Sequence, residues 1–375
     1  MYTIVVAAAA SRTSGALTMY NQFLNHLKNH VGENQYYIFV HPSMPKPRID
    51  GVKYIEIDIT SIINRLRFDY FGCAEYLKSH QIKADLLFSF ENTGLRVKNI
   101  PQFILYQQGL PFYPKKWNPF KASERSLFVY TFIYPIFVKM SLFRNSKVIV
   151  HTPYLRERFS CKYHYDKDKI YSMLPDVEYV DVNSCEVYDF ANACYNFLYP
   201  SVYVKYKEHN TLIRALVVMK EKNYELLKKI RIHLTIKKEE NIELVRYLEK
   251  EDLLDNFVFE GFMPRNKLLA MYNSCTGLLF PSTIESVTLP LWEAVAFNKP
   301  VVCQNLDFAH YQLDGYDGVR FIEVNNYEKW CDAIIDTCMQ RKEIKPYTPV
   351  KGNSWENLFK WIEDTVVDYQ ITKKR

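Results

Sequence analysis

Residues 279–302 read LFPSTIESVTLPLWEAVAFNKPVV, and this stretch decides the fold class. An apolar run ends at Pro281 and a short polar loop follows it. A helix is expected to begin near Leu289 or Pro290, because proline is accepted in the first turn of a helix. A second apolar run closes the segment. A strand, a loop, a helix and another strand in this order predict an α/β unit with parallel strands.

The same alternation continues along the chain. Strands are expected at 3–9, 36–41, 53–57, 86–89, 102–107 and 147–151, and again at 197–199, 231–236, 258–260, 277–280, 300–304 and 320–322. This layout predicts two α/β domains in tandem, joined between about 175 and 196. We expect the first domain over 1–180 and the second over 181–352. An amphipathic closing helix with a basic tail is expected over 353–375.

Composition narrows the class of protein. The chain has 375 residues, of which 48% are apolar and 24% are charged, as in ordinary globular proteins. Its 8 cysteines form no C-x-x-C pair, so we expect reduced thiols, no metal site and a cytoplasmic location. The chain start lacks the features of a signal peptide. The uncharged run 127–138 is shorter than the roughly twenty residues of a membrane span, so a core or surface helix is expected there.

Charge is unevenly distributed. Residues 1–180 hold 23 Lys and Arg against 14 Asp and Glu, whereas residues 181–375 hold 25 against 28. A basic half is compatible with nucleic acid, an anionic membrane or phosphorylated substrates, or with a surface that selects no partner. Residues 112–121 mix aromatic side chains with lysines, as membrane-interface segments do. The alternative is a loop whose aromatic side chains pack on their own domain.

The loop before residue 289 has the chemistry of an anion site. Backbone N–H groups at a helix start have no intrahelical partner, and together with the helix dipole they favour a phosphate. Glu285 precedes the helix and Glu293 lies inside it. A carboxylate that accepts hydroxyl hydrogen bonds suits a sugar or a ribose. Two carboxylates also suggest a glycosidase, which requires both at one scissile bond, and the phosphate-binding context disfavours that alternative.

The flanking residues make the pattern more specific. Glu285 and Glu293 stand in Glu-x7-Glu spacing, followed by Ala-Val-Ala-x3-Pro-Val-Val. This stretch resembles the signature of retaining GT-B glycosyltransferases of the large family four, which includes bacterial O-antigen, capsule and lipopolysaccharide enzymes. The resemblance implies two Rossmann-like domains that face a central cleft, with a C-terminal helix closing back toward the first domain.

The resemblance also implies roles for individual residues. Glu285 would contact hydroxyls of the transferred sugar, Glu293 would bind the nucleotide ribose, and the amides of Val287, Thr288 and Leu289 would approach the donor phosphates. Thr288 replaces a frequent glycine of the signature. Gly261 matches the family glycine beside the donor, and Lys207 matches the lysine at the diphosphate, with Lys205 as a substitute for an arginine that many members carry about five residues before that lysine. On the acceptor side, Ser14 and Gly15 resemble the small-residue loop of the family, and Gln107 and Gln108 stand where some relatives place a histidine of the catalytic cleft.

The expected activity is metal-independent transfer of a sugar, with retention, from a nucleotide diphosphate sugar to an acceptor hydroxyl. No cofactor is expected besides this donor substrate. The resemblance points to O-antigen or capsule assembly, and the basic first half suits a lipid-linked oligosaccharide acceptor, with peripheral contact to the inner face of the plasma membrane and no nucleic acid partner.

Alternative functions remain open. They are a non-catalytic GT-B scaffold or partner subunit, and a GT-B phosphorylase or epimerase. A nicotinamide oxidoreductase is disfavoured, because residues 7–16 contain one glycine where Gly-x-Gly-x-x-Gly requires three.

Overall fold

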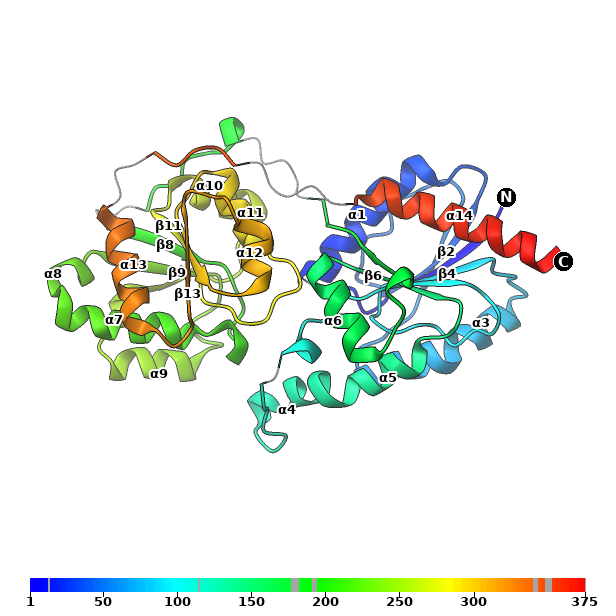
Figure 1. The fold of residues 1–375 in the computed structure, drawn as a ribbon, viewed down its shortest axis with the longest axis horizontal. Coiled ribbons are helices and arrows are strands. Elements are labelled where there is room, and N and C mark those ends of the chain that lie inside the picture. Colours follow the sequence, from blue (N-terminus) through cyan, green and yellow to red (C-terminus); the bar gives the residue numbers. More distant parts are fainter. Residues whose placement is uncertain are drawn as a thin grey trace. The chain divides into compact units, whose positions relative to one another are not determined.

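A computed structural model describes residues 1–12, 14–113, 115–176, 182–190, 194–339, 343–347 and 353–374. The chain divides into two compact units (Figure 1). The first comprises Met1–Asp176 and Lys351–Arg375, and the second comprises Val177–Val350. The borders expected after residues 180 and 352 lie outside the described ranges.

The first unit is built on a seven-stranded parallel sheet with the order β3-β2-β1-β4-β5-β6-β7. Its strands are β1 (Thr3–Ala7), β2 (Gln35–Val40), β3 (Val52–Glu56), β4 (Leu86–Ser89), β5 (Gln102–Leu105), β6 (Ser146–Val150) and β7 (Ile170–Ser172). The strand order reverses between β1 and β4. In such sheets ligands bind at the carboxyl ends of the strands next to this reversal.

Most helices of the first unit lie between consecutive strands, and α14 follows the second unit in the chain. The helices are α1 (Ser14–His30), α2 (Ile62–Arg67), α3 (Cys73–Ser79), α4 (Ala122–Phe128), α5 (Tyr134–Ser141), α6 (Pro153–Tyr163) and α14 (Trp355–Lys374). Two π-helical turns, η1 (Phe68–Gly72) and η3 (Val129–Ile133), join α2 to α3 and α4 to α5, and single 3-10 turns lie at η2 (Leu110–Phe112) and η4 (Lys167–Lys169). The run 127–138 thus forms parts of α4, η3 and α5. Within the described residues, no helix is both long and apolar enough to cross a membrane.

Helix α14 completes the core of the first unit. Its buried residues Trp355, Leu358, Ile362 and Val366 recur every three or four positions, so they form one face of the helix. This face packs with α1 and the strands, and the Trp355 indole N–H donates a 3.1 Å hydrogen bond to Gln22 of α1. The end of the chain therefore supplies part of the core around its beginning.

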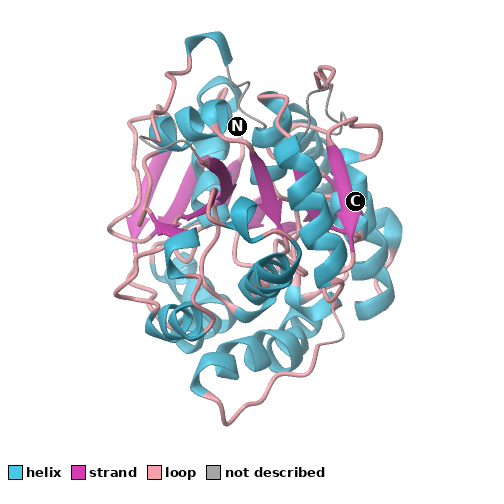
Figure 2. Cartoon of the chain, turned by 90° about the vertical axis from the view of Figure 1, so that its left-hand side faces the viewer, coloured by secondary structure: helices cyan, strands magenta, loops and turns pink. Residues whose placement is uncertain are grey.

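The second unit repeats the architecture with a six-stranded parallel sheet of order β10-β9-β8-β11-β12-β13. The strands are β8 (Tyr195–Tyr199), β9 (Ile230–Leu234), β10 (Phe257–Phe259), β11 (Gly277–Phe280), β12 (Val301–Gln304) and β13 (Val319–Ile322). Here the order reverses between β8 and β11. In Figure 2 the strands form a layer with helices on both sides.

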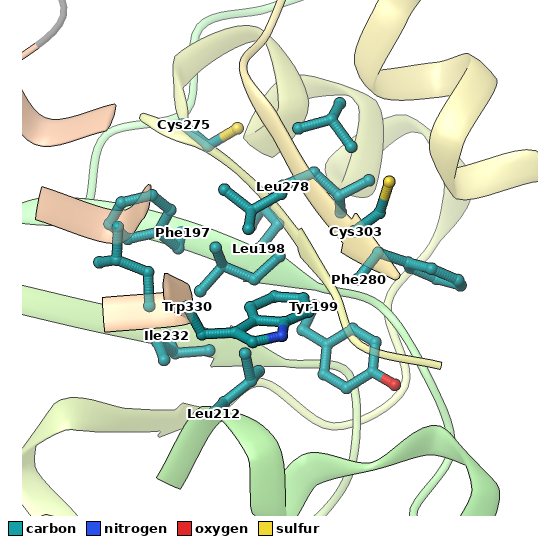
Figure 3. Packing of buried hydrophobic residues seen from close by; sticks show 14 of the residues in the cluster. Phe197, Leu198, Tyr199, Leu212, Ile232, Cys275, Leu278, Phe280, Cys303 and Trp330 are labelled. Atoms are coloured by element: carbon teal, nitrogen blue, oxygen red, sulfur yellow. The ribbon is translucent and has the colours of Figure 1, made fainter. Parts of the chain in front are cut away.

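Seven helices are described in the second unit: α7 (His209–Lys222), α8 (Tyr224–Leu227), α9 (Ile242–Lys250), α10 (Arg265–Ser274), α11 (Leu289–Ala296), α12 (Asp307–Leu313) and α13 (Tyr327–Met339). Short 3-10 turns lie at η5 (Val182–Ser184), η6 (Lys205–Lys207) and η7 (Leu254–Asn256). One apolar core runs through the unit, in which Trp330 of α13 packs beside the strand residues Phe197 and Leu198 (Figure 3). A core of this size fixes the strand ends from which the candidate site projects.

The prediction of two α/β domains is confirmed, and the two expected sets of six strands correspond to twelve of the thirteen strands found in the described ranges. Strands β4 and β11 agree to the residue with the predicted ranges 86–89 and 277–280. The sequence reading missed β7, a three-residue strand of Ile, Tyr and Ser at the edge of the first sheet.

Candidate functional site

The candidate site of the second unit lies where its strand order reverses. Lys207 follows β8, and Glu285 follows the neighbouring strand β11. Because parallel strands end at the same edge of a sheet, residues 78 positions apart in the chain meet there. Two hydrogen bonds join the loops: the amide and hydroxyl of Thr283 donate to the Tyr206 carbonyl, at 2.9 and 3.0 Å.

Lys207 and Glu285 form an ion pair, in which the lysine Nζ donates to the carboxylate Oε1. Their side chains are only 14% and 12% exposed. The ammonium group also lies 5.6 Å from the ring centre of Tyr206 and 5.7 Å from that of Phe280. A charge pair with so little solvent around it interacts more strongly than a surface pair, and it holds both groups in place.

Helix α11 begins directly after this pair, at Leu289, as the sequence predicts. Leu289 is its first residue and Pro290 its second, so neither has an N–H group bonded inside the helix. The Thr288 amide donates a 3.0 Å hydrogen bond to Oε1 of the buried Gln312, whose Nε2 donates back to the Thr288 carbonyl at 2.9 Å. The Thr288 amide is thus already bonded, and of the three amides expected to approach a phosphate, those of Val287 and Leu289 remain for that role.

Glu293 lies one turn further into α11 and is 4% exposed. Its Oε1 accepts a hydrogen bond from Arg265, the first residue of α10. Burial and the neighbouring Glu293 raise the pKa of the Tyr272 hydroxyl, so this tyrosine stays protonated. The sequence reading did not identify Arg265. The signal in the sequence that could have indicated a partner is the position of Glu293 within an apolar helical stretch. A carboxylate that such a helix buries requires a charged or hydrogen-bonding partner.

Gly261 and Lys205 lie in the loops that follow β10 and β8. Gly261 follows β10 with a φ of +71°, a conformation that side chains rarely adopt, and its amide donates a 3.1 Å hydrogen bond to the Ile236 carbonyl. Phe262, the next residue, is 87% exposed. Lys205 begins η6, two residues before Lys207, and is exposed. Lys205 and Lys207 therefore lie in the same loop.

His209 stands at the start of α7, behind Lys207. Burial and the Lys207 charge lower the pKa of this histidine to about 3. Its ring packs 4.8 Å from that of Tyr199 and its Nε2 lies 3.3 Å from the Ser201 hydroxyl. His209 is therefore neutral at physiological pH and does not compete with Lys207 for an anion.

The four residues expected on the acceptor side lie in the first unit. Ser14 and Gly15 begin α1 after β1, and open space surrounds the Cβ position of Gly15. Gln107 and Gln108 follow β5, at the same edge of the sheet. The Gln108 side chain accepts a 3.3 Å hydrogen bond from the Leu110 amide. These residues thus share a sheet edge but come from strands separated by β4.

No metal cluster is found in the described part of the chain, where no three His, Cys, Asp or Glu side chains gather so that they could hold an ion.

Comparison with known proteins supports this reading of the fold. Residues 191–345 match the family model described as glycosyl transferases group 1. No curated protein sequence matches the chain at a significant level. Among solved structures, WaaG, a glycosyltransferase involved in lipopolysaccharide biosynthesis, superposes with a TM-score of 0.63 and 15% identity over 90% of each chain.

Two further structures show the same similarity. A glycosyltransferase from Rickettsia africae has a TM-score of 0.60 and 15% identity, over 90% of this chain and 88% of that one. HepE from Anabaena, solved in complex with UDP and glucose, has a TM-score of 0.60 and 13% identity, over 91% and 90%. The chain therefore has the GT-B fold, and within it residues 191–345 match the model of glycosyl transferases group 1.

Proposed function

We propose that the protein is a glycosyltransferase that moves a sugar from a nucleotide diphosphate sugar to an acceptor hydroxyl with retention of configuration. The observation that carries this proposal is the buried Lys207–Glu285 pair beside the start of α11. It combines a cation and free helix amides for phosphate with a carboxylate for sugar hydroxyls. The donor bound by HepE, UDP-glucose in one of its structures, is of the same class.

Each group has one task in this proposal. Lys207 and the amides of Val287 and Leu289 stabilise the negative charge that develops on the departing diphosphate, without a metal ion. Glu285 orients the transferred sugar through its hydroxyls, and Glu293 accepts hydrogen bonds from the nucleotide ribose. The leaving phosphate takes the proton of the acceptor hydroxyl on the same face of the sugar, which gives retention.

A donor panel followed by a transfer assay tests the proposal. The matching nucleotide diphosphate sugar should raise the unfolding temperature of the full chain, because it binds only the native state. Lys207→Ala should lower turnover by roughly 100-fold, the usual loss when one stabilising group for a developing charge is removed. Glu285→Gln should lower turnover by a similar factor, because the transferred sugar loses the carboxylate that orients it. Glu225→Gln, an exposed carboxylate on α8 of the same unit, is the matched control. Full activity in both site variants would refute the proposal.

We also propose that the acceptor is a lipid-linked oligosaccharide, used at the cytoplasmic face of a membrane in cell-surface polysaccharide assembly. Two of the similar structures are WaaG, involved in lipopolysaccharide biosynthesis, and WaaB, a lipopolysaccharide outer core galactosyltransferase. The first unit presents a set of exposed apolar side chains, which we call the apolar surface: Ile63, Phe71, Phe120, Phe132, Ile133, Ile136 and Met140, between 40% and 90% exposed. The basic side chains of Lys116, Lys121 and Arg125 are also exposed, and they lie on both sides of Phe120 in the sequence.

The arrangement of the apolar surface supports the proposed membrane contact. Residues 132, 133, 136 and 140 recur at helical spacing along η3 and α5, so they share one side. Tyr70 donates a 3.0 Å hydrogen bond to the Phe137 carbonyl, which holds η1 and its exposed Phe71 beside α5. Trp117, expected in the same contact, is buried and donates a 2.8 Å hydrogen bond to Thr131. Apolar side chains flanked by cations favour an anionic bilayer surface.

Vesicle binding distinguishes a membrane face from an incidental patch. The full chain should co-sediment with phosphatidylglycerol vesicles, and Ile136→Ser combined with Phe132→Ser should weaken this binding several-fold. Ile242→Ser in the second unit is the matched control, because Ile242 and Ile136 are both 57% exposed. Equal binding by all three proteins would remove the proposed membrane contact and leave the donor site untouched.

A further inference from the structure

A small polar cavity lies at the carboxyl edge of the first unit's sheet. Its volume is about 140 Å³, and its lining residues are Ala10, Arg12, Ile59, Thr60, Ser61, Ile62, Arg65 and Tyr130. The first two follow β1, and residues 59–65 follow β3. Ala10 is also bonded to the loop after β4, through a 2.9 Å hydrogen bond from its amide to Glu91. The cavity therefore adjoins the reversal of strand order between β1 and β4, where parallel sheets bind ligands.

Arg65 gives this cavity a buried cation. The residue is 7% exposed, and its Nε and Nη2 atoms are buried without a hydrogen-bond partner. Its guanidinium carbon lies 4.6 Å from the centre of the Tyr134 ring, which fixes the plane of the group. Burying a guanidinium whose N–H donors lack partners costs folding free energy. A ligand that accepts hydrogen bonds from these donors would recover part of that free energy.

Two carboxyl groups stand behind Arg65, outside the lining of the cavity. Glu91 accepts the hydrogen bond from Ala10, and Asp69 accepts one of 2.6 Å from the Thr93 hydroxyl. Burial raises the pKa of Glu91 to about 7 and that of Asp69 well above its ordinary value. Burial therefore disfavours the charged form of both carboxyl groups near Arg65.

The lining itself is cationic. Among its residues, Arg12 and Arg65 carry guanidinium groups and none carries a carboxylate. Thr60, Ser61 and Tyr130 add hydroxyl groups, and the Ser61 oxygen already accepts the Asn64 amide at 3.1 Å, which leaves its proton for donation. Guanidinium pairs and hydroxyl donors are the groups that bind phosphoryl oxygens, often two at a time.

We propose that this cavity binds a phosphoryl group of the acceptor, held between Arg12 and Arg65. The inference rests on the proposed transferase function and deepens it, since it requires the acceptor to carry a phosphoryl group close to the hydroxyl that receives the sugar. A volume of about 140 Å³ admits a single phosphoryl group and excludes a nucleotide.

Calorimetric titration of the full chain with inorganic phosphate tests the site. Arg12→Gln should weaken phosphate binding by roughly ten-fold or more, the usual effect of losing one charge-assisted contact. Arg67→Gln, an exposed arginine on the helix α2 that also carries Arg65, is the charge-matched control and should leave binding unchanged. Arg65→Lys is a second test, because it keeps the buried charge but removes the planar guanidinium group that can donate two parallel hydrogen bonds to a phosphoryl group. It should also weaken phosphate binding. Thermal unfolding of each variant confirms that it is folded.

Two results identify the source of the phosphoryl group. Lys207→Ala should retain the phosphate binding that Arg12→Gln loses; the reverse pattern would assign phosphate to the donor site and overturn the proposal. In transfer assays, a hexose 1-phosphate should inhibit more strongly than the corresponding methyl hexoside, and Arg12→Gln should abolish this difference. Equal inhibition in the wild type, or equal losses in the Arg12 and Arg67 variants, would also overturn it. The nucleotide-sugar panel measures donor binding separately, so the proposed function can hold even where this site fails.

Discussion

The Lys207–Glu285 pair allows a quantitative test in the unliganded protein. We consider the single substitutions Lys207→Met and Glu285→Gln and the double variant that combines them. At contact distance and an effective dielectric constant of about 20, two unit charges attract by about 4 kcal/mol. Desolvation offsets part of this attraction, because both side chains are more than four-fifths buried.

Each single substitution leaves the other charge buried and unpaired. Breaking a buried pair in this way costs about 3–5 kcal/mol, and the residual exposure of this pair places it near the lower end. The double variant removes both charges, so we expect it to be destabilised by less than either single variant. The coupling energy of the cycle should therefore reach about 2 kcal/mol or more.

Hydrogen exchange measured by mass spectrometry reports this effect in the full chain. Peptides covering β8 and β11 should lose protection by roughly 100-fold in each single variant, since about 1.4 kcal/mol corresponds to a factor of ten. Peptides of the first unit serve as an internal reference. If the losses in the two single variants simply add in the double variant, the two charges are not coupled, and the reasoning about the site is wrong.

Three further predictions concern stability. The pKa of His209 is about 6.5 in the unfolded chain and about 3 in the folded protein, so the stability contributed by the neutral ring is present above pH 6.5 and is lost as the pH falls. The free energy of chemical unfolding at pH 4.5 should therefore be lower by about 2–3 kcal/mol. His209→Gln should largely remove this pH-dependent loss. Trp355→Ala should destabilise the first unit by about 3–5 kcal/mol, with exchange in the second unit unchanged. Gly261→Ala should cost about 1–2 kcal/mol, because its φ is +71°, and an unchanged denaturation midpoint would contradict this.

Much of the fold could be predicted because several strands are short, fully buried apolar runs. Leu86–Ser89 and Gly277–Phe280 are buried at every position, so their limits appear directly in the sequence. Strand Ile170–Ser172 is half-buried and lies at a sheet edge, and its three residues do not form a recognisable run. Edge strands of this kind depend on pairing with a neighbour, which local sequence does not reveal.

The candidate site was predictable only in part. Glu285, Val287, Leu289 and Glu293 lie in one continuous segment whose spacing indicates a ligand site. The hydrogen-bond partners of this segment lie far from it in the sequence. Arg265, the partner of Glu293, lies 28 residues before it, and Gln312, the partner of Thr288, lies 24 residues after it. Such contacts are set by how helices pack on the sheet.

The buried cluster in the first unit was missed for a related reason. Arg65, Asp69 and Glu91 stand in segments that read as ordinary solvated turns and helix surfaces. The fold instead buries all three, and Asp69 and Glu91 have almost no contact with solvent. Sequence patterns indicate where apolar residues are buried, but they do not indicate which charged residues are buried with them.

The position of α14 has a consequence for biosynthesis. A ribosome produces residues 355–374 after all of the second unit, yet Trp355 and Leu358 fill the interior of the first. The first unit therefore cannot mature when its own strands emerge, whereas the second is translated as one continuous stretch and can reach its native state earlier. Domains that are made first generally fold first, and this chain is expected to reverse that order, with a nascent N-terminal sheet that waits for its last helix.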